Sequence, residues 1–152
     1  MIRANLKAML ERHEGRKRVP YNDTATPPNL TVGVGWNMHT NPLPDDVALY
    51  LGQHGEITDE MIDRLLEISV WKAEASCRRV WPGFDGFSRN RQDALIDFMF
   101  NCGEKTVRGF TNTVADISAG RWASAAARLM KSAWAKEVKG RALDVTNLLK
   151  EG

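Results

Sequence analysis

Apolar residues at helical spacing open the chain. Leu6, Met9 and Leu10 recur every three to four positions, and His13 continues the same stripe. Charged side chains occupy most of the intervening positions. This pattern predicts an amphipathic helix over the first dozen residues, ending near Glu14–Gly15.

A longer apolar stripe begins after residue 57. Thr58 can cap the start of a helix, and Asp59 and Glu60 would face the positive end of its dipole. The stripe ends at Trp81-Pro82-Gly83, where proline and glycine interrupt helical structure. The pattern therefore predicts one long helix. Its apolar positions are Ile62, Leu66, Val70, Ala73, Cys77 and Val80.

The carboxy half is predicted to be helical throughout. A segment that begins at Ser88 has apolar residues on nearly every side, as expected for a central helix surrounded by other helices. Shorter helices are expected over 112–119, 122–134 and 138–149, with glycines at or near the breaks between them.

Only one part of the chain has the pattern of β-strands. Residues 19–38 contain the alternating run Leu30-Thr31-Val32-Gly33-Val34-Gly35, which predicts short strands around a polar turn. The segment 41–55 that follows has weak periodicity and contains Pro42 and Pro44, so we interpret it as a loop with one short helix.

Together these elements predict an α+β fold in which helix predominates. We expect residues 1–152 to form a single domain with two lobes, because this length is usual for one domain. A small amino-terminal β-sheet lobe (1–56) would precede a long connecting helix (57–81) and a carboxy-terminal helical lobe (82–152). Such an arrangement would leave a cleft between the lobes.

The charge balance excludes a dedicated nucleic-acid binder. The 21 Lys and Arg residues exceed the 19 Asp and Glu residues by only two, far from the strongly basic composition of such proteins. Residues 121–152 are more basic, with seven basic and three acidic side chains. This excess suits an anionic polymer, although a solvated helical surface with scattered lysines explains it equally well.

The two cysteines do not indicate a disulfide or a metal site. Cys77 and Cys102 lie among apolar residues in predicted helices, the usual setting of a free buried thiol. Neither has a Cys or His partner at metal-ligand spacing, so we expect no metal and no cofactor. Residues 1–14 lack the continuous apolar stretch of a signal peptide or membrane anchor, which predicts a cytoplasmic starting location.

Glu14, Asp23 and Thr31 are candidates for a glycosidase site. Cleavage of a glycosidic bond needs one acid that protonates the leaving oxygen and a second group that guides a water or stabilises the cation-like sugar. Glu14 ends the first helix, and a chain reversal before Asp23 would let the two carboxyl groups face one another. Thr31 on the next strand could hold a water beside Asp23. The spacing alone leaves open that Glu14 is an ordinary surface carboxylate at a helix end.

The order of the motifs resembles the active-site signature of the phage T4-type lysozymes. His13-Glu14-Gly15 precedes Tyr21-Asn22-Asp23-Thr24 and the strand run that opens at Thr31, which resembles a glutamate, eight residues, an aspartate, a short turn and a T-[VI]-G-[VI]-G strand. The resemblance continues in the same order over nearly the whole chain. Its later segments are Ile57-Thr58 with the long helix, Ala94-Leu95-Ile96, Phe100-Asn101-Cys102-Gly103-Glu104, Gly109-Phe110-Thr111-Asn112, Arg121-Trp122 and Lys131-Ser132-Ala133-Trp134.

The resemblance implies a muramidase that cleaves the β-1,4 bond between N-acetylmuramic acid and N-acetylglucosamine in peptidoglycan, with inversion. Glu14 would be the general acid, Asp23 the carboxylate that assists the water, and Thr31 its positioning partner. Arg141 would approach Glu14 and hold it by charge pairing, unless it is an ordinary helix arginine. Glycan contacts are implied at Asn37, Phe100, Asn101, Thr113 and Arg128, with Phe100 alternatively part of the core.

Two features depart from the family pattern. The turn between Asp23 and Thr31 has seven residues in place of the usual five, so we expect a different hairpin tip. Because the strand motif resumes intact at Thr31, we expect Pro27 and Pro28 to stiffen the longer turn and leave the catalytic end in register. Trp36 replaces a common histidine, so an ion pair of the family should be absent. Trp36 would either line the cleft or pack in the core.

Two other functions remain open at this stage. A lytic transglycosylase needs an acid but no water-activating aspartate, so the presence of both Asp23 and Thr31 favours hydrolysis. A catalytically inactive wall-binding domain with a lysozyme-like fold would not need Glu14, Asp23 and Thr31 to be intact.

The resemblance also implies the setting in which the protein works. Its partner would be the glycan strands of peptidoglycan, and we expect a monomer. The protein would stay in the host cytoplasm until its release to the periplasm and cell wall. A membrane-opening protein such as a holin, or delivery as part of a larger particle, would then bring it to the wall.

Overall fold

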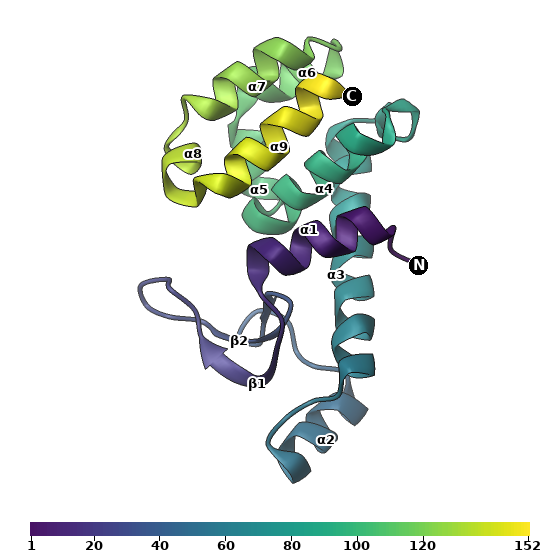
Figure 1. Ribbon diagram of the computed structural model, residues 1–152, viewed down its shortest axis with the longest axis vertical. Helices are drawn as coiled ribbons and strands as arrows, with labels where there is room; N and C mark the ends of the chain where they lie inside the picture. The colour runs from purple at the N-terminus through teal and green to yellow at the C-terminus, as the bar shows by residue number, and fades with distance from the viewer. The chain divides into compact units, whose positions relative to one another are not determined.

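The computed structural model describes residues 1–152, which form two compact units, residues 1–69 and 70–152. The boundary lies inside helix α3. The elements of the first unit are α1 (Ala4–Glu14), β1 (Lys17–Asn22), β2 (Leu30–Gly33), β3 (Trp36–Asn37), α2 (Asp45–His54) and the first half of α3 (Asp59–Val80) (Figure 1). After α3, the second unit contains a 3-10 turn (Phe84–Gly86), α4 (Arg89–Cys102), α5 (Glu104–Gly109), α6 (Thr111–Ser118), α7 (Trp122–Met130), α8 (Ala133–Val138) and α9 (Gly140–Glu151).

The strands form one small antiparallel sheet in the order β1-β2-β3. Asn22 pairs with Leu30 and Tyr21 pairs with Thr31, so the two strands meet directly at the ends of the long turn. Asn37 of β3 lies opposite Thr31 on the other side of β2. The turn of seven residues therefore leaves Thr31 in regular pairing on both sides, as predicted for the catalytic end of the hairpin.

Charged side chains join β1 to the start of α3. The guanidinium of Arg16, just before β1, donates to Asp63 at 2.8 Å and to Asp59 at 3.3 Å. Arg18 on β1 pairs with the same Asp59, and its carbonyl accepts a hydrogen bond from the backbone of Ile57 at 3.0 Å. These contacts hold the sheet of the first unit against the amino-terminal turns of α3.

The start of α3 confirms the predicted cap. The hydroxyl of Thr58 accepts a hydrogen bond from the backbone N–H of Met61 at 3.1 Å, so it satisfies one of the donors that a helix start leaves open. The short helix expected within the loop 41–55 is α2, which occupies ten of these residues. Pro44 precedes this helix, Asp45 and Asp46 fill its first turn, and Gly55 ends it in the left-handed conformation, which are the usual signals of a helix.

Helix α4 is the core helix of the second unit, as predicted. Its residues 93–99 are all buried, and it contacts α9, which in turn packs on α7 (Figure 1). The ring of Phe98 makes edge-to-face contacts with Phe110 and Trp134, at centroid distances of 5.4 and 4.9 Å. Ser88 caps the helix by accepting a hydrogen bond from the backbone of Arg91. The predicted α+β fold with predominant helix is confirmed.

Three local predictions for this unit were incomplete. Helix α5 was not foreseen, because six residues are too few for a clear apolar stripe. The helix expected over 122–134 is broken at Lys131, and Ser132 caps the next helix by accepting from the backbone of Ala135. Cys77 is buried as expected, but Cys102 at the end of α4 is only half-buried. Both are free thiols.

Two further observations concern membrane spans and metal ligands. None of the helices combines the length and apolar character that a membrane crossing requires. No group of three or more His, Cys, Asp or Glu side chains lies close enough together to hold a metal ion.

Candidate active site

Glu14 is the last residue of α1 and lies against the turn between β2 and β3. Its carboxyl group packs on the backbone of Gly35, where an added Cβ would be 3.0 Å from Cδ and 3.1 Å from Oε2 of Glu14. Gly35 also has φ of +67°, a conformation that residues with a side chain rarely adopt. The second glycine of the strand motif is therefore required both by the turn and by the space that Glu14 fills.

Asp23 follows β1 and is held by the long turn. Its Oδ1 accepts hydrogen bonds from the backbone N–H groups of Ala25 at 3.0 Å and Asn29 at 2.8 Å. The side-chain amide of Asn29 donates to Oδ2 at 3.1 Å. These bonds, the one from the Asn29 backbone foremost, lower the pKa of the Asp23 carboxyl below its ordinary value. Asp23 is thus kept as an anion in a fixed orientation.

Thr31 on β2 is connected to Asp23 through Asn29. The Thr31 hydroxyl donates to the carbonyl oxygen of Asn29 at 3.1 Å, and the residue is 5% exposed. Asn29 of the turn therefore contacts both Asp23 and Thr31. The sequence did not single out Asn29, because an asparagine inside a polar turn carries no pattern of its own.

Tyr21 lies within the electrostatic range of both proposed catalytic carboxylates. Its partial burial, together with the negative charges of Glu14 and Asp23, raises the pKa of its hydroxyl above the ordinary value. The phenol of Tyr21 therefore stays protonated and neutral. Tyr21 belongs to the motif that contains Asp23, but the motif by itself did not indicate this position.

Trp36 and Asn37 form β3, the last strand of the same sheet. Trp36 is 4% exposed, and its indole donates to the carbonyl of Asn41 at 2.9 Å, so packing is the alternative that applies. The side-chain oxygen of Asn37 accepts from the backbone of His39 at 2.9 Å and of Thr40 at 3.3 Å. Asn37 thereby shapes the turn after β3, and its predicted glycan contact stays a prediction.

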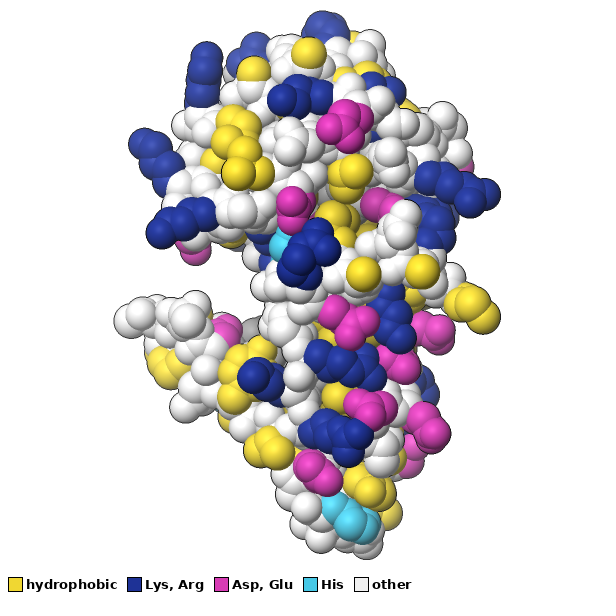
Figure 2. All heavy atoms as spheres, viewed as in Figure 1, with side chains coloured by type: hydrophobic (Ala, Val, Ile, Leu, Met, Phe, Trp, Pro, Cys, Tyr) yellow, Lys and Arg dark blue, Asp and Glu magenta, His cyan; other side chains and the backbone are white.

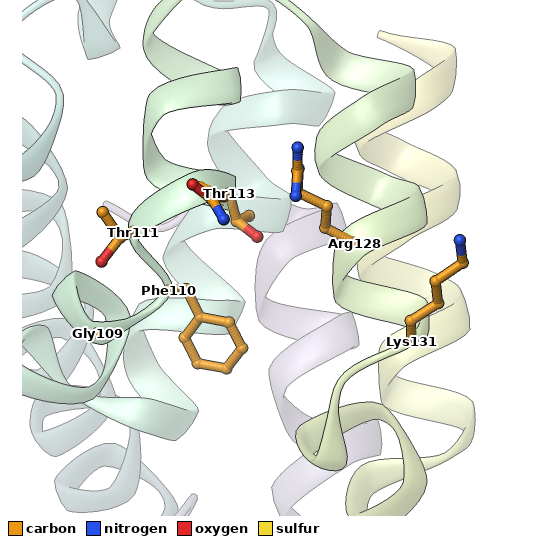
Figure 3. A pocket seen from close by; sticks show the side chains of 7 residues that line it. Gly109, Phe110, Thr111, Thr113, Arg128 and Lys131 are labelled. Carbon is orange, nitrogen blue, oxygen red and sulfur yellow. The ribbon is translucent and has the colours of Figure 1, made fainter.

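Two of the predicted glycan contacts in the second unit line one pocket. Thr113 in the first turn of α6 and Arg128 on α7 border a space of roughly 480 Å³. Figure 3 shows Phe110 and Thr113 on one side of this space, with Arg128 and Lys131 on the other. The other lining residues are Gly109, Thr111 and Asn112.

Phe100 and Asn101 at the end of α4 do not line this pocket. Phe100 is half-buried, so it is not the fully enclosed core residue of the alternative interpretation. The side-chain oxygen of Asn101 accepts a hydrogen bond from the indole of Trp134 at 2.7 Å. Their roles toward a glycan stay predictions.

Arg141 on α9 is a buried residue with a partner that the sequence did not indicate. Its Nε donates to Oδ1 of Asp97 on α4 at 2.7 Å, and Nη2 donates to the Asp97 carbonyl at 3.4 Å. The side chain of Asp97 is fully buried, and that of Arg141 is 8% exposed. A charged residue inside the apolar α4 segment could have signalled that a buried counter-ion was needed. The role of Arg141 toward Glu14 stays a prediction.

Comparison with known proteins agrees with the order of the motifs. The family model described as phage lysozyme matches residues 11–149. Over 97% of the chain, the sequence is 28% identical to the pre-baseplate central spike protein Gp5 of Enterobacteria phage T4, but it spans only 28% of that longer protein. It is 25% identical to a probable T4-type lysozyme 2 of Dictyostelium discoideum, over 98% of the chain and 95% of that protein. The match across nearly all residues shows that this chain belongs to the phage lysozyme family, a family of glycosidases, as the sequence motifs predicted.

Proposed function

We propose that the protein hydrolyses the β-1,4 bond between N-acetylmuramic acid and N-acetylglucosamine in peptidoglycan. The family supports a peptidoglycan hydrolase. The observation that carries the finer proposal is the set of hydrogen bonds made by Asn29. Its backbone and side-chain N–H groups donate to the Asp23 carboxylate, and its carbonyl oxygen accepts a hydrogen bond from the Thr31 hydroxyl. This arrangement suits an anion that guides a water, which a hydrolase needs and a lytic transglycosylase does not.

The proposed reaction is a single displacement with inversion at the anomeric carbon. Glu14 donates its proton to the glycosidic oxygen, and the leaving sugar departs with the bonding electron pair. A water held by Thr31 and Asp23 attacks the opposite face of the sugar ring and loses its proton to Asp23. The hydrogen bonds to Asp23 favour its anion, which suits the role of base.

We propose that the glycan contacts include Asn37, Phe100, Asn101, Thr113 and Arg128. The pocket shared by Thr113 and Arg128 supports this for the second unit. We also propose that Arg141 assists Glu14 by charge, and that the enzyme reaches the wall through a membrane-opening protein or a delivery particle.

The decisive test is digestion of purified peptidoglycan followed by mass spectrometry of the products. The proposal predicts free reducing N-acetylmuramic acid ends. NMR spectra of early products should show the inverted anomer. Anhydromuramic ends would instead identify a lytic transglycosylase, and binding without any product would identify an inactive wall-binding domain.

The role of Glu14 is tested by Glu14→Gln, with Glu11→Gln as the matched control. Both positions lie in the last turn of α1, and both substitutions remove one negative charge. Glu14→Gln should abolish product formation while the circular dichroism spectrum stays that of the wild type, and Glu11→Gln should keep most of the activity. A Glu14→Gln variant with near-normal turnover would show that another group is the acid.

A further inference from the structure

Asp116 on α6 is a buried carboxylate that no step of the proposed reaction uses. Its side chain is 4% exposed, and both of its oxygens are engaged. Oδ1 accepts from Nε of Arg121 at 2.9 Å, and Oδ2 accepts from the Ser124 hydroxyl at 2.6 Å and from Nε of Arg128 at 2.8 Å. The hydrogen bond from Ser124, followed by those from the two arginines, lowers the pKa of this carboxyl to about 2. Asp116 is therefore an anion throughout the physiological range.

The hydrogen bond to Asp116 fixes the orientation of the Arg128 guanidinium. Only Nε of Arg128 is used, so the two terminal nitrogens of the guanidinium donate no hydrogen bond to another group of the chain. A guanidinium carries five N–H donors in a rigid plane, so anchoring Nε orients the remaining four. The side chain of Arg128 is half exposed, and a long side chain without an anchor would sample many rotamers.

Arg128 borders the pocket described above, and the charges around that pocket are positive. Asp116 is shared by two arginines, so the cluster of Asp116, Arg121 and Arg128 keeps one net positive charge. Lys131 adds a second positive charge on the same side of the pocket, and no acidic side chain lines it (Figure 3). Phe110 provides an apolar wall and Thr113 a hydroxyl group. The pocket suits a ligand with an anionic group next to an apolar surface.

The surface around the pocket is also positively charged. The basic residues of the α7–α8 region are exposed, and Figure 2 shows Lys and Arg side chains over this surface with fewer acidic ones. Residues 121–152 carry the basic excess already visible in the sequence. An anionic ligand would therefore also be attracted before it makes contact.

We infer that Asp116 is a positioning residue that holds the guanidinium of Arg128 at this pocket, where it binds a carboxylate on the substituents of the glycan. The identity of the ligand rests on the proposed function, because muramic acid in peptidoglycan carries a peptide with free carboxylates. The orientation of Arg128 by Asp116 rests only on the contacts within the second unit.

The alternative is that Asp116 merely joins α6 to α7. Asp116 bonds to three residues at or after the end of α6, so its loss would lower stability in either case. A joining role predicts weaker folding without a change in selectivity for charged ligands. A positioning role predicts that the effect on carboxylate binding passes through Arg128.

The experiment measures binding by calorimetry with the full chain carrying Glu14→Gln, so that no turnover occurs. The probes are soluble glycan oligomers bearing peptides with free carboxylates, and the same oligomers after conversion of the carboxylates to amides. We expect the acid form to bind about tenfold more tightly, the effect of one charge-assisted hydrogen bond. Asp116→Asn should remove most of this preference and leave the affinity for the amide form unchanged.

A double-mutant cycle with Arg128→Gln separates the two roles. Once Arg128 is replaced, Asp116→Asn should cause no further loss of carboxylate preference. Arg121→Gln is the matched control, because Arg121 pairs with the same carboxylate but does not line the pocket. It should keep the preference. The inference is overturned if Asp116→Asn keeps the preference for the acid form. It is also overturned if Asp116→Asn lowers this preference by the same factor after Arg128 has been replaced.

Two further measurements keep the test decisive. If Asp116→Asn does not fold, Arg128→Lys keeps the positive charge but loses the planar fork, and it should lose the preference as well. Retention of the preference in Arg128→Lys would then overturn the inference. Failure of the proposed function is a separate result: the wild type would release no product from peptidoglycan, whatever its preference for carboxylates.

Discussion

Gly35 and Glu14 are in direct contact: a single methyl group on Gly35 would lie 3.0 Å from the carboxyl carbon of Glu14. The spacing is tighter than ordinary van der Waals contact, so the glutamate would have to move. The end of α1 and the turn after β2 are thus fitted to one another at the proposed acid.

This contact predicts the effect of Gly35→Ala. We expect a loss of about 1–2 kcal/mol in the free energy of unfolding, because the backbone is left-handed at this position. We also expect most of the hydrolytic activity to be lost, since Glu14 is displaced. Turbidity clearing and urea denaturation measure the two effects.

The chain offers a matched control at Gly55, which has a similar φ of +74° but no atom within 4 Å of an added Cβ. Gly55→Ala should lose comparable stability and keep its specific activity. Equal activity losses in both variants would show that strain, and not displacement of Glu14, is the cause.

The hydrogen bonds of Asp23 predict a shift in the pH dependence of activity. Asn29→Ala removes the side-chain donor to Oδ2, so the pKa of Asp23 should rise toward its ordinary value. Because the proposed role of Asp23 requires the anion, activity should then fall at a higher pH on the acid side of the profile. Rates measured from pH 3 to 8 would show the shift.

Asn22→Ala provides the control for this change. Asn22 is exposed, precedes Asp23 directly and donates none of the hydrogen bonds to its carboxylate. Its acid limb should coincide with that of the wild type. An unchanged profile in Asn29→Ala would contradict the assignment of Asp23 to that limb.

The buried pair of Asp97 and Arg141 predicts a large effect on stability. Asp97→Ala removes a buried carboxylate that accepts a hydrogen bond from the buried Arg141, so we expect a loss of about 3–5 kcal/mol in the free energy of unfolding. Asp85→Ala breaks the exposed ion pair with Arg78 and should cost less than about 1 kcal/mol. Guanidinium denaturation compares the two, and similar losses would show that burial does not decide the strength of the pair.

Glu104 predicts a contribution to stability that disappears in acid. Hydrogen bonds from Arg79 and then Arg108 lower the pKa of its carboxyl to about 2, from an ordinary value of 4.5. A lowered pKa stabilises the folded state above the ordinary value, and this contribution is lost as the pH falls from about 4.5 to about 2. Glu104→Gln should therefore lower the melting temperature at pH 7 and leave it unchanged near pH 2.

The exposed Glu67 on α3 is the control for the loss of one negative charge. Glu67→Gln should leave the melting temperature nearly constant at both pH values. Because Glu104 is partly exposed, we expect its contribution at pH 7 to be less than about 1 kcal/mol. If Glu104→Gln still melted below the wild type at pH 2, the assignment of this contribution to the Glu104 carboxylate would be contradicted.

Elements with a clear apolar pattern could be predicted from the amino-acid sequence. The apolar stripes of α1 and α3 and the alternating run of β2 identified these elements, because burial of one face imposes a period on the sequence. The segment of α4 was recognisable because it is apolar on nearly every side, as expected for a helix enclosed by others. The cap at Thr58 could also be predicted, because capping depends on residues only three positions apart. The family was recognisable from the order of short motifs around Glu14, Asp23 and Thr31.

The polar groups that contact one another could not be predicted from the sequence, because they depend on how the elements pack. Asn29 beside Asp23, Asp97 beside Arg141, and Asp116 beside Arg128 are separated by 6, 44 and 12 residues, and no periodicity connects them. Each pairing exists because a buried or oriented charge must be satisfied by whichever donor the packing of the elements brings within reach. The same holds for the proposed acid. The sequence motif identified Glu14, whereas its close contact with Gly35 is visible only in the fold.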